Sequence, residues 1–151
     1  MKYALILLGL AGVLVLMLAF QRPISVVPPL PQTASASSVT VGTSTILVEV
    51  ADTNEKRTRG LSGRQSLSEN HGMLFIFDYE NNWGIWMKDM RFPIDIIWAD
   101  SRGKIITIAR NVSPGTFPNA FYPAAPARYV LELPAGETAT RGIVEEMHIE
   151  F

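Results

Sequence analysis

The chain contains no cysteine and has only two histidines, His71 and His148, among its 151 residues. Without cysteine it cannot form a disulfide, a thiolate zinc site or a cysteine nucleophile. Two histidines are too few for a histidine-rich metal site, although one histidine with carboxylates would suffice for a smaller one. No metal and no other cofactor is predicted.

A strong charge of either sign is also lacking. The 13 basic and 14 acidic residues give a formal net charge of −1. Proteins that bind nucleic acid usually carry a basic surface that contacts the phosphates. The composition gives no sign of such a surface, so nucleic acid is not an expected partner.

The longest uncharged run lies near the N-terminus and covers Tyr3 to Phe20. As a helix it would extend about 27 Å, close to the thickness of the hydrocarbon core of a bilayer. The apolar part of a signal peptide is usually shorter, and no small-residue cleavage site directly follows Phe20. We therefore expect residues 1–20 to be an uncleaved membrane anchor, with a cleaved signal segment as the alternative.

Residues 21–38 contain four prolines and four serines, a composition that disfavours both helix and sheet and predicts a linker. Residues 39–151 are then expected to form a single domain. Lys2 precedes the apolar run and Arg22 follows it, a weak bias that places the N-terminus inside and the domain outside. The prediction is a single-pass protein of the cell membrane, whose domain lies on the extracytoplasmic, periplasmic side in the cell envelope.

Short alternating or apolar stretches predict strands throughout the domain. They are Thr45–Val50, Met73–Phe77, Gly84–Met90, Ile94–Ala99, Lys104–Ala109, Ala127–Leu133 and Met147–Phe151. A capping box that starts at Asp52 predicts a helix over Thr53–Arg59, and another is expected over Ala135–Arg141. His71-Gly72 is predicted as a turn. The expected fold is mainly β, a curved antiparallel sheet or small barrel-like fold with two short helices.

Several motifs together resemble the domain of unknown function 192 family: VEVADTNEKRTRGLSGRQSL, GMLFIF, IWMKDMRFPIDIIWAD, and ARYVLELPAG followed by TRGI. They occur in the family's order and spacing between Thr45 and Ile149. The resemblance implies a small β-rich fold, often behind a signal or membrane anchor in prokaryotes, and no established activity. Many relatives carry two cysteines in the loop before ARYVLEL, whereas the same loop here, NVSPGTFPNAFYPAAP, has none.

All three tryptophans lie in one stretch, residues 82–100, NWGIWMKDMRFPIDIIWAD. Pro93 predicts a break between two strands, because it cannot donate a hydrogen bond within a sheet. Trp98 alternates in phase with apolar residues and is expected in the core. Trp86 is in phase with Lys88, so the first strand is either a barrel strand whose lysine stem packs on the indole or the wall of a cleft.

Asp95 stands between two isoleucines and would need a partner if it were buried. The available cations are Lys88 and the arginines at positions 59, 64 and 128. Arg59 and Arg64 also flank a turn with two glycines that could hold a carboxylate or phosphate, although helix capping and surface charge explain them as well. In the strand over residues 127–133, Arg128 and Glu132 are expected to face outward.

These residues form the predicted ligand-binding set: Arg59, Arg64, Trp86, Lys88, Asp95, Arg128 and Glu132. They favour a binding module for a small anionic ligand, a glycan or a segment of a partner. One alternative is an enzyme that acts on an envelope substrate through Asp95, Lys88 and Arg128. The other is a structural or assembly role. No catalytic residue is assigned, since Ser62 does not lie in a nucleophile elbow, and enzymatic activity is uncertain and less favoured.

The apolar run leads to a prediction about location. The full-length protein should fractionate with membranes at its full mass, because about 18 apolar residues suffice to anchor a helix in a bilayer. A shortened chain that begins near Val39 should stay in solution. Recovery of a processed chain that starts after Ala36, in the soluble envelope fraction, would contradict the anchor.

Overall fold

Nine strands, two α-helices and one 3₁₀ turn make up residues 37–151, the part of the chain that this computed structural model describes. The strands are β1 Ser37–Val41, β2 Ser44–Ala51, β3 His71–Asn81, β4 Ile85–Trp86, β5 Ile94–Ala99, β6 Ile105–Val112, β7 Ala120–Phe121, β8 Ala127–Pro134 and β9 Ile149–Glu150. The helices are α2 Asn54–Arg59 and α3 Glu137–Thr140, and the 3₁₀ turn η1 is Pro114–Thr116.

The predicted anchor over residues 1–20, and all but the end of the predicted linker over 21–38, lie outside the described residues. Among residues 37–151, no helix has the length and apolar character needed to cross a membrane. Strand β1 begins at Ser37, two residues inside the expected linker. A shortened chain that is meant to keep the whole sheet should therefore begin before Ser37.

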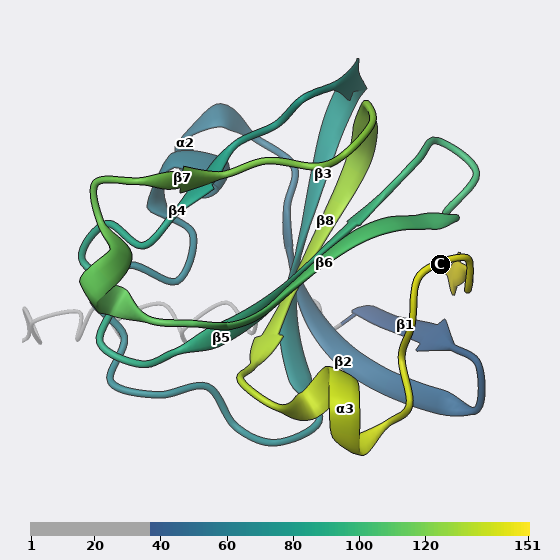
Figure 1. Ribbon diagram of the computed structural model, residues 1–151, viewed down its shortest axis with the longest axis horizontal. Helices are drawn as coiled ribbons and strands as arrows, with labels where there is room; N and C mark the ends of the chain where they lie inside the picture. The colour runs from purple at the N-terminus through teal and green to yellow at the C-terminus, as the bar shows by residue number, and fades with distance from the viewer. Residues whose placement is uncertain (1–36) are drawn as a thin grey trace, which may run out of the picture. The chain divides into compact units, whose positions relative to one another are not determined.

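Seven strands form one curled sheet in the order β6-β5-β8-β3-β2-β1-β9, and β4 pairs with β7 in a separate small ribbon. In Figure 1 the strands of the large sheet cross steeply near its centre, and β4 and β7 lie over α2. The prediction of a mainly β, curved fold with two short helices is confirmed. The sheet is not wholly antiparallel, however, because β2 and β3 run parallel.

The parallel pair follows from the position of α2 between the two strands. A short helix and loop carry the chain from the end of β2 back to the start of β3, a crossover that parallel strands require. The helix begins at Thr53, whose side chain accepts a hydrogen bond from the Lys56 amide at 3.3 Å, and not at the predicted cap, Asp52. It ends at Gly60, whose φ of 48° suits glycine.

The prediction of a turn at His71-Gly72 is wrong, because both residues begin β3. A glycine is needed at position 72 for close packing, and not for a turn. A Cβ atom on Gly72 would lie only 2.8 Å from the backbone oxygen of Glu132 on the neighbouring β8. The glycine therefore allows two central strands to approach closely.

Both faces of the sheet's middle strands are covered. Strand β8 lies between β5 and β3, and all six residues of β5 are buried. One core cluster packs on one face around Phe75, Trp98 and Val130, and the other face carries a second cluster around Leu74, Ile97 and Leu131. The predicted outward face of β8 is therefore not at the solvent, since Val130 and Glu132 are both buried.

The tryptophan stretch matches the prediction in part. A break does separate β4 from β5 at Pro93, and Trp98 is completely buried. The first strand contains only two residues, however, because the next backbone segment bonds to the α2–β3 loop instead of to a strand. The carbonyl oxygen of Lys88 accepts from the Ser62 hydroxyl at 2.8 Å, and that of Asp89 accepts from the Gly63 amide at 2.9 Å.

The two ends of the domain meet, as expected, through an intervening strand. Strand β1 pairs with β2 on one side and with β9 on the other, which makes β2 and β9 near neighbours. The last predicted strand, residues 147–151, contains only Ile149 and Glu150. Residues before it bond to β6, where the Ile105 amide donates to the Met147 carbonyl at 2.8 Å.

Trp98→Ala should leave little folded protein. The indole is fully buried and donates from Nε1 to the Trp83 carbonyl at 2.9 Å. Loss of a buried tryptophan typically costs about 3–5 kcal/mol, a large part of the about 5–15 kcal/mol that stabilises a domain. Trp86→Ala should instead fold, because Trp86 is 53% exposed. Thermal unfolding of both variants would test this, and equal losses would contradict the assignment of Trp98 alone to the core.

Candidate functional site

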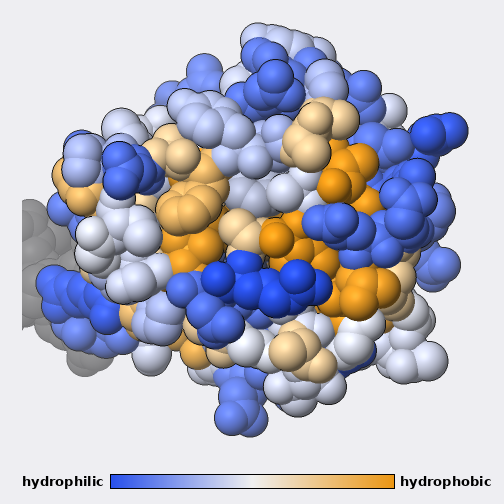
Figure 2. All heavy atoms as spheres, viewed as in Figure 1, coloured by the Kyte–Doolittle hydropathy of each residue, from blue (hydrophilic) through white to orange (hydrophobic). Residues whose placement is uncertain are grey.

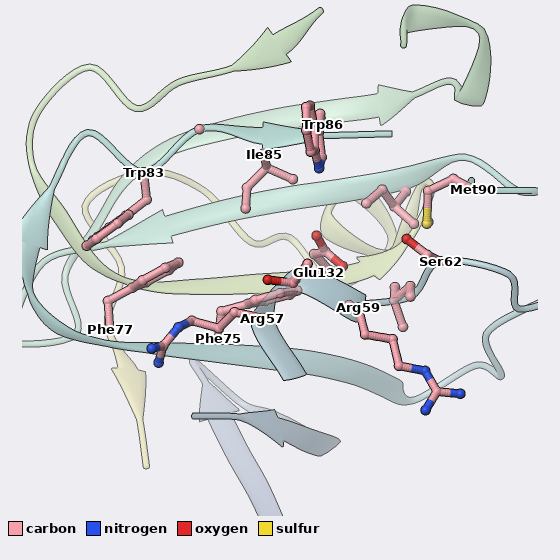
Figure 3. A pocket seen from close by; sticks show the side chains of 15 residues that line it. Arg57, Arg59, Ser62, Phe75, Phe77, Trp83, Ile85, Trp86, Met90 and Glu132 are labelled. Atoms are coloured by element: carbon pink, nitrogen blue, oxygen red, sulfur yellow. The ribbon is translucent and has the colours of Figure 1, made fainter. Parts of the chain in front are cut away.

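A pocket of about 210 Å³ opens between α2 with its following loop on one side and the segment around β4 on the other. Its floor comes from the middle of the large sheet. Figure 3 shows Trp83 and Phe77 at one end, Ser62 and Met90 at the other, and Glu132 between them. The aromatic and aliphatic lining residues are Phe75, Phe77, Trp83, Trp86, Leu61, Ile85, Met90 and Ile94, and the side chains with polar groups are Arg57, Thr58, Arg59, Ser62 and Glu132.

Glu132 is the central feature of the floor. It lies on β8, directly between Met73 of β3 and Ile96 of β5, and only 4% of its surface is exposed. No described residue donates a hydrogen bond to its carboxyl group. Because no fully enclosed side-chain oxygen or nitrogen of the described residues lacks a partner, the carboxyl oxygens are open to the pocket, where water or a bound molecule can reach them.

Burial raises the pKa of Glu132 from 4.5 to about 8, because an apolar environment disfavours the charged form. The nearby Arg64 guanidinium acts in the opposite direction and lowers this pKa. The effect of burial is the larger of the two, and Arg64 is itself paired with Glu49 through hydrogen bonds of 2.5 and 2.8 Å. Glu132 is therefore mainly protonated at neutral pH and can both donate and accept a hydrogen bond.

A stacked aromatic pair forms the end wall of the pocket. The rings of Phe77 and Trp83 lie 4.1 Å apart and nearly parallel, at 10°. All three polar groups of Trp83 are hydrogen-bonded, since its Nε1 donates to the Tyr79 carbonyl at 3.1 Å, its amide donates to the Asn81 carbonyl at 2.9 Å and its carbonyl accepts from Trp98. These contacts hold the indole in place at the wall.

Trp86 stands over the pocket from β4. Its ring meets Phe117 edge to face at 5.9 Å, and the Lys88 ammonium lies 5.9 Å from its centre on the solvent side. In Figure 3 the indole nitrogen points from the ring toward the part of the pocket that holds Glu132. The lysine head, the Lys88 ammonium, thus lies over the indole ring, and the same indole lines the pocket, as the cleft alternative expected.

Two arginines lie at the rim and differ in their contacts. Arg57 donates to the carbonyl oxygens of Asp52 and Ile76 at 2.9 and 2.7 Å, and its guanidinium lies over the Phe77 ring at 5.3 Å. The side chain of Arg59 makes no hydrogen bond or ion pair with another described residue, and its head is turned away from Glu132 (Figure 3). Arg57 therefore supports the aromatic wall, whereas Arg59 is free to meet an acidic group at the rim.

Asp95 is fully buried but does not belong to the pocket. Its Oδ1 accepts from the Asn111 amide at 2.8 Å. Its Oδ2 accepts from the amides of Gly136 and Thr138, at 3.1 and 3.0 Å, and from the Thr138 hydroxyl at 2.6 Å. The expectation of a cationic partner is wrong, because four neutral donors satisfy this carboxylate and tie α3 to the sheet.

The remaining predicted residues also lie elsewhere. Arg64 pairs with Glu49, Lys88 is exposed beside Trp86, and the Arg128 Nε donates to the Phe77 carbonyl at 3.3 Å. The structure thus brings three of the seven predicted residues into one pocket, Arg59, Trp86 and Glu132, and separates the other four from it.

The sequence reasoning missed most of the apolar lining. Phe75 and Phe77 lie in a stretch that was correctly predicted as a buried strand, and nothing in that pattern separates a core face from a pocket face. Ser62 was considered only as a nucleophile, although its hydroxyl joins the two walls of the pocket through the Lys88 carbonyl. Trp83 had one usable signal, its place in the tryptophan-rich stretch.

The surface around the site is mixed in character. Figure 2 shows hydrophobic side chains that reach the surface in separate patches, one of them over β4 and β7, with hydrophilic side chains around them. Within residues 37–151, no three histidine, aspartate or glutamate side chains come together as metal ligands would. The groups that the pocket presents include a carboxyl group, hydroxyl groups and aromatic rings.

These features define a class of protein, a mainly β domain whose curled sheet carries an aromatic pocket with a buried carboxyl group on its floor. The chain belongs to the domain of unknown function 192 family, because the model of that family, described as "Uncharacterized ACR", matches residues 37–151. A UPF0127 protein from Thermococcus gammatolerans is 36% identical over 102 residues, which cover 65% of this chain and 61% of that relative. The match thus spans about three fifths of the relative's length.

Two crystal structures share the fold. One, named a "putative transcription regulator" from Sinorhizobium meliloti, is 31% identical and has a TM-score of 0.72 over 77% of this chain and 95% of its own. The other, a protein of unknown function from Novosphingobium aromaticivorans, is 29% identical with a TM-score of 0.73 over 77% and 85%. The family resemblance seen in the motifs is confirmed, together with the fold.

Replacing Glu132 should change how stability depends on pH. Between about pH 4.5 and 8 the unfolded chain releases a proton that folded Glu132 keeps. The free energy of unfolding therefore falls as pH rises through this window, by up to about 1.4 kcal/mol per pH unit. Glu132→Gln lacks this loss, so its stability relative to the unaltered protein should grow from pH 5 to 8 and then level off.

Urea unfolding at several pH values gives the free energy of unfolding of the variant and of the unaltered protein. The contributions of the other titrating groups cancel in the difference between the two. If Glu132→Gln followed the pH dependence of the unaltered protein, the buried carboxyl group would not carry a raised pKa.

Proposed function

We propose that this protein is a binding module that holds a small ring-shaped molecule, most simply one sugar unit of a glycan, in the pocket above Glu132. The observation that carries this proposal is the carboxyl group of Glu132, which opens to an otherwise largely apolar pocket and receives no hydrogen bond from a described residue. A ligand hydroxyl group could both donate to this carboxyl group and accept from it, in place of water.

The shape and chemistry of the pocket support a sugar. Its volume of about 210 Å³ is below the about 300–1,000 Å³ of sites for drug-sized ligands. The flat faces of Phe77, Trp83 and Trp86 suit the apolar C–H face of a sugar ring. Hydroxyl groups both donate and accept, so they can bond to Glu132, Ser62 and the Trp86 indole nitrogen.

A small anionic ligand fits less well. The negative group of such a ligand would meet Glu132 at the floor, and the two would repel each other whenever Glu132 ionised. Arg57 is already engaged with carbonyl oxygens. The Arg59 side chain at the rim has no partner among the described residues. It could pair with one acidic substituent of a sugar, such as a carboxylate, that lies outside the pocket floor. A partner segment would need to offer a similar small polar group.

An enzyme is the second candidate, because a carboxyl group with a pKa of about 8 can act as a general acid or base near neutral pH. Glycoside hydrolysis normally needs two carboxyl groups about 5–9.5 Å apart, and Glu132 is the single one among the residues that line the pocket. The set expected for catalysis, Asp95, Lys88 and Arg128, is not assembled. These points favour binding over hydrolysis.

The proposed setting is the cell envelope, with the domain held outside the membrane by residues 1–20. The apolar run near the N-terminus and the linker composition support it. The S. meliloti structure is named for transcription regulation, but removing Lys2 and Arg22 leaves the domain with 11 basic and 14 acidic residues. A net charge of −3 does not favour binding to nucleic-acid phosphates.

Trp86→Ala and Glu132→Met should each weaken sugar binding about tenfold or more while the domain stays folded. Trp86 is half exposed, and methionine fills the space of Glu132 without a buried carboxyl group. Calorimetry or ligand-observed NMR with glucose, N-acetylglucosamine and galacturonic acid would measure the effect. These three probes differ in charge and in their substituents.

The matched control is Phe151→Ala, which removes another exposed aromatic ring, 60% exposed and remote from the lining residues. It should bind the same sugar as the unaltered protein. Failure of the unaltered protein to bind any of the three, or unchanged affinity in Trp86→Ala and Glu132→Met, would overturn the proposal.

A further inference from the structure

A second hollow adjoins the first pocket along the Phe77–Trp83 wall. The two share four lining residues, Arg57, Thr58, Phe77 and Trp83. The second hollow is additionally lined by Asn54, Asp78 and Tyr79. Because these four residues border both spaces, the two hollows are adjacent and the Phe77–Trp83 wall lies between them.

We propose that the site takes a chain of at least two linked sugar units, one above Glu132 and the next in the hollow beside Tyr79. This inference rests on the proposed function and adds a second subsite to it. The first unit is selected by the buried carboxyl group, which is 4% exposed and faces the pocket without a partner from the described chain.

The aromatic side chains form a continuous path between the two subsites. Tyr79 and Trp83 lie 5.3 Å apart with their rings tilted by 51°, and Trp83 then stacks on Phe77 at 4.1 Å. Tyr79 is 61% exposed, so a large part of its ring is open to a ligand. A second sugar ring stacked on Tyr79 would cover this surface.

Polar groups of the second hollow suit hydroxyls rather than a strong charge. Asp78 is exposed and makes no side-chain hydrogen bond with another described residue. The Tyr79 hydroxyl can both donate and accept. The Arg57 guanidinium at the border is already bonded to Asp52, Asn54 and Ile76, so it fixes the wall rather than capturing an anion.

The second hollow is open, so a separate sugar unit would bind there only weakly. A unit that is linked to a sugar in the first pocket would bind more readily. Once the first unit is bound, however, the second is held at a high effective concentration beside its own subsite. The affinity should therefore depend on the length of the chain and reach its full value once both subsites are filled.

The test is calorimetry with two length series, N-acetylglucosamine oligomers of one to four units and galacturonic acid oligomers of the same lengths. In the series that binds, the affinity of the unaltered protein should rise about tenfold from one unit to two. Tyr79→Ala should lose this gain and keep the affinity for one unit, because Tyr79 does not line the first pocket.

Tyr122→Ala is the matched control, since Tyr122 is equally exposed, at 62%, and lines neither space. It should keep both the affinity for one unit and the gain with length. Equal binding of one and two units by the unaltered protein would overturn the second subsite and leave the proposed function standing. Absence of binding in both series would overturn the proposed function and this inference together.

Discussion

The covering of both faces of β8 is the constraint on which the rest of this domain depends. A strand in the middle of a curled sheet, with a core on each side, leaves water little access to its central side chains, from Val130 to Leu133. Every polar group that the chain places there must find a partner or lose its charge. Glu132 loses its charge by staying protonated. The pocket lies above it because α2 and β4 do not cover the carboxyl group.

Two buried carboxyl groups on neighbouring strands show how differently this constraint can be met. Asp95 receives four hydrogen bonds from neutral donors and thereby ties α3 and the end of β6 to the sheet. Glu132 receives none from the described residues, and its pKa rises to about 8. Its carboxyl group opens instead to the pocket. A carboxyl group that faces a mostly apolar pocket and has no partner among the described residues is the argument for a ligand.

The aromatic side chains connect the core to this site. Trp98, in the core, donates to the Trp83 carbonyl, and Trp83 stacks on Phe77 at the pocket wall. A change in the core would therefore reach the site through two contacts. On the other side, the Ser62 hydroxyl and the Gly63 amide hold the backbone of Lys88 and Asp89. The segment that carries Trp86 is thus tied to the α2–β3 loop, and the two walls of the pocket are fixed relative to each other.

The sequence by itself determined the elements whose pattern is local. Five predicted strands correspond to β2, β3, β5, β6 and β8, and the helix before Gly60 and the family were also found, because alternation, turn glycines and motif order are local properties. What only the tertiary structure decided is which face of each strand meets a second layer. Glu132 looked exposed because it alternates with Leu131 and Leu133, yet the segment around β4 and the α2–β3 loop covers that face. Asp95 looked like half of an ion pair because its donors, at Asn111, Gly136 and Thr138, are backbone and hydroxyl groups that no charge pattern reveals. The pocket itself joins residues 57 to 132, and a contact across that separation depends on how the sheet curls.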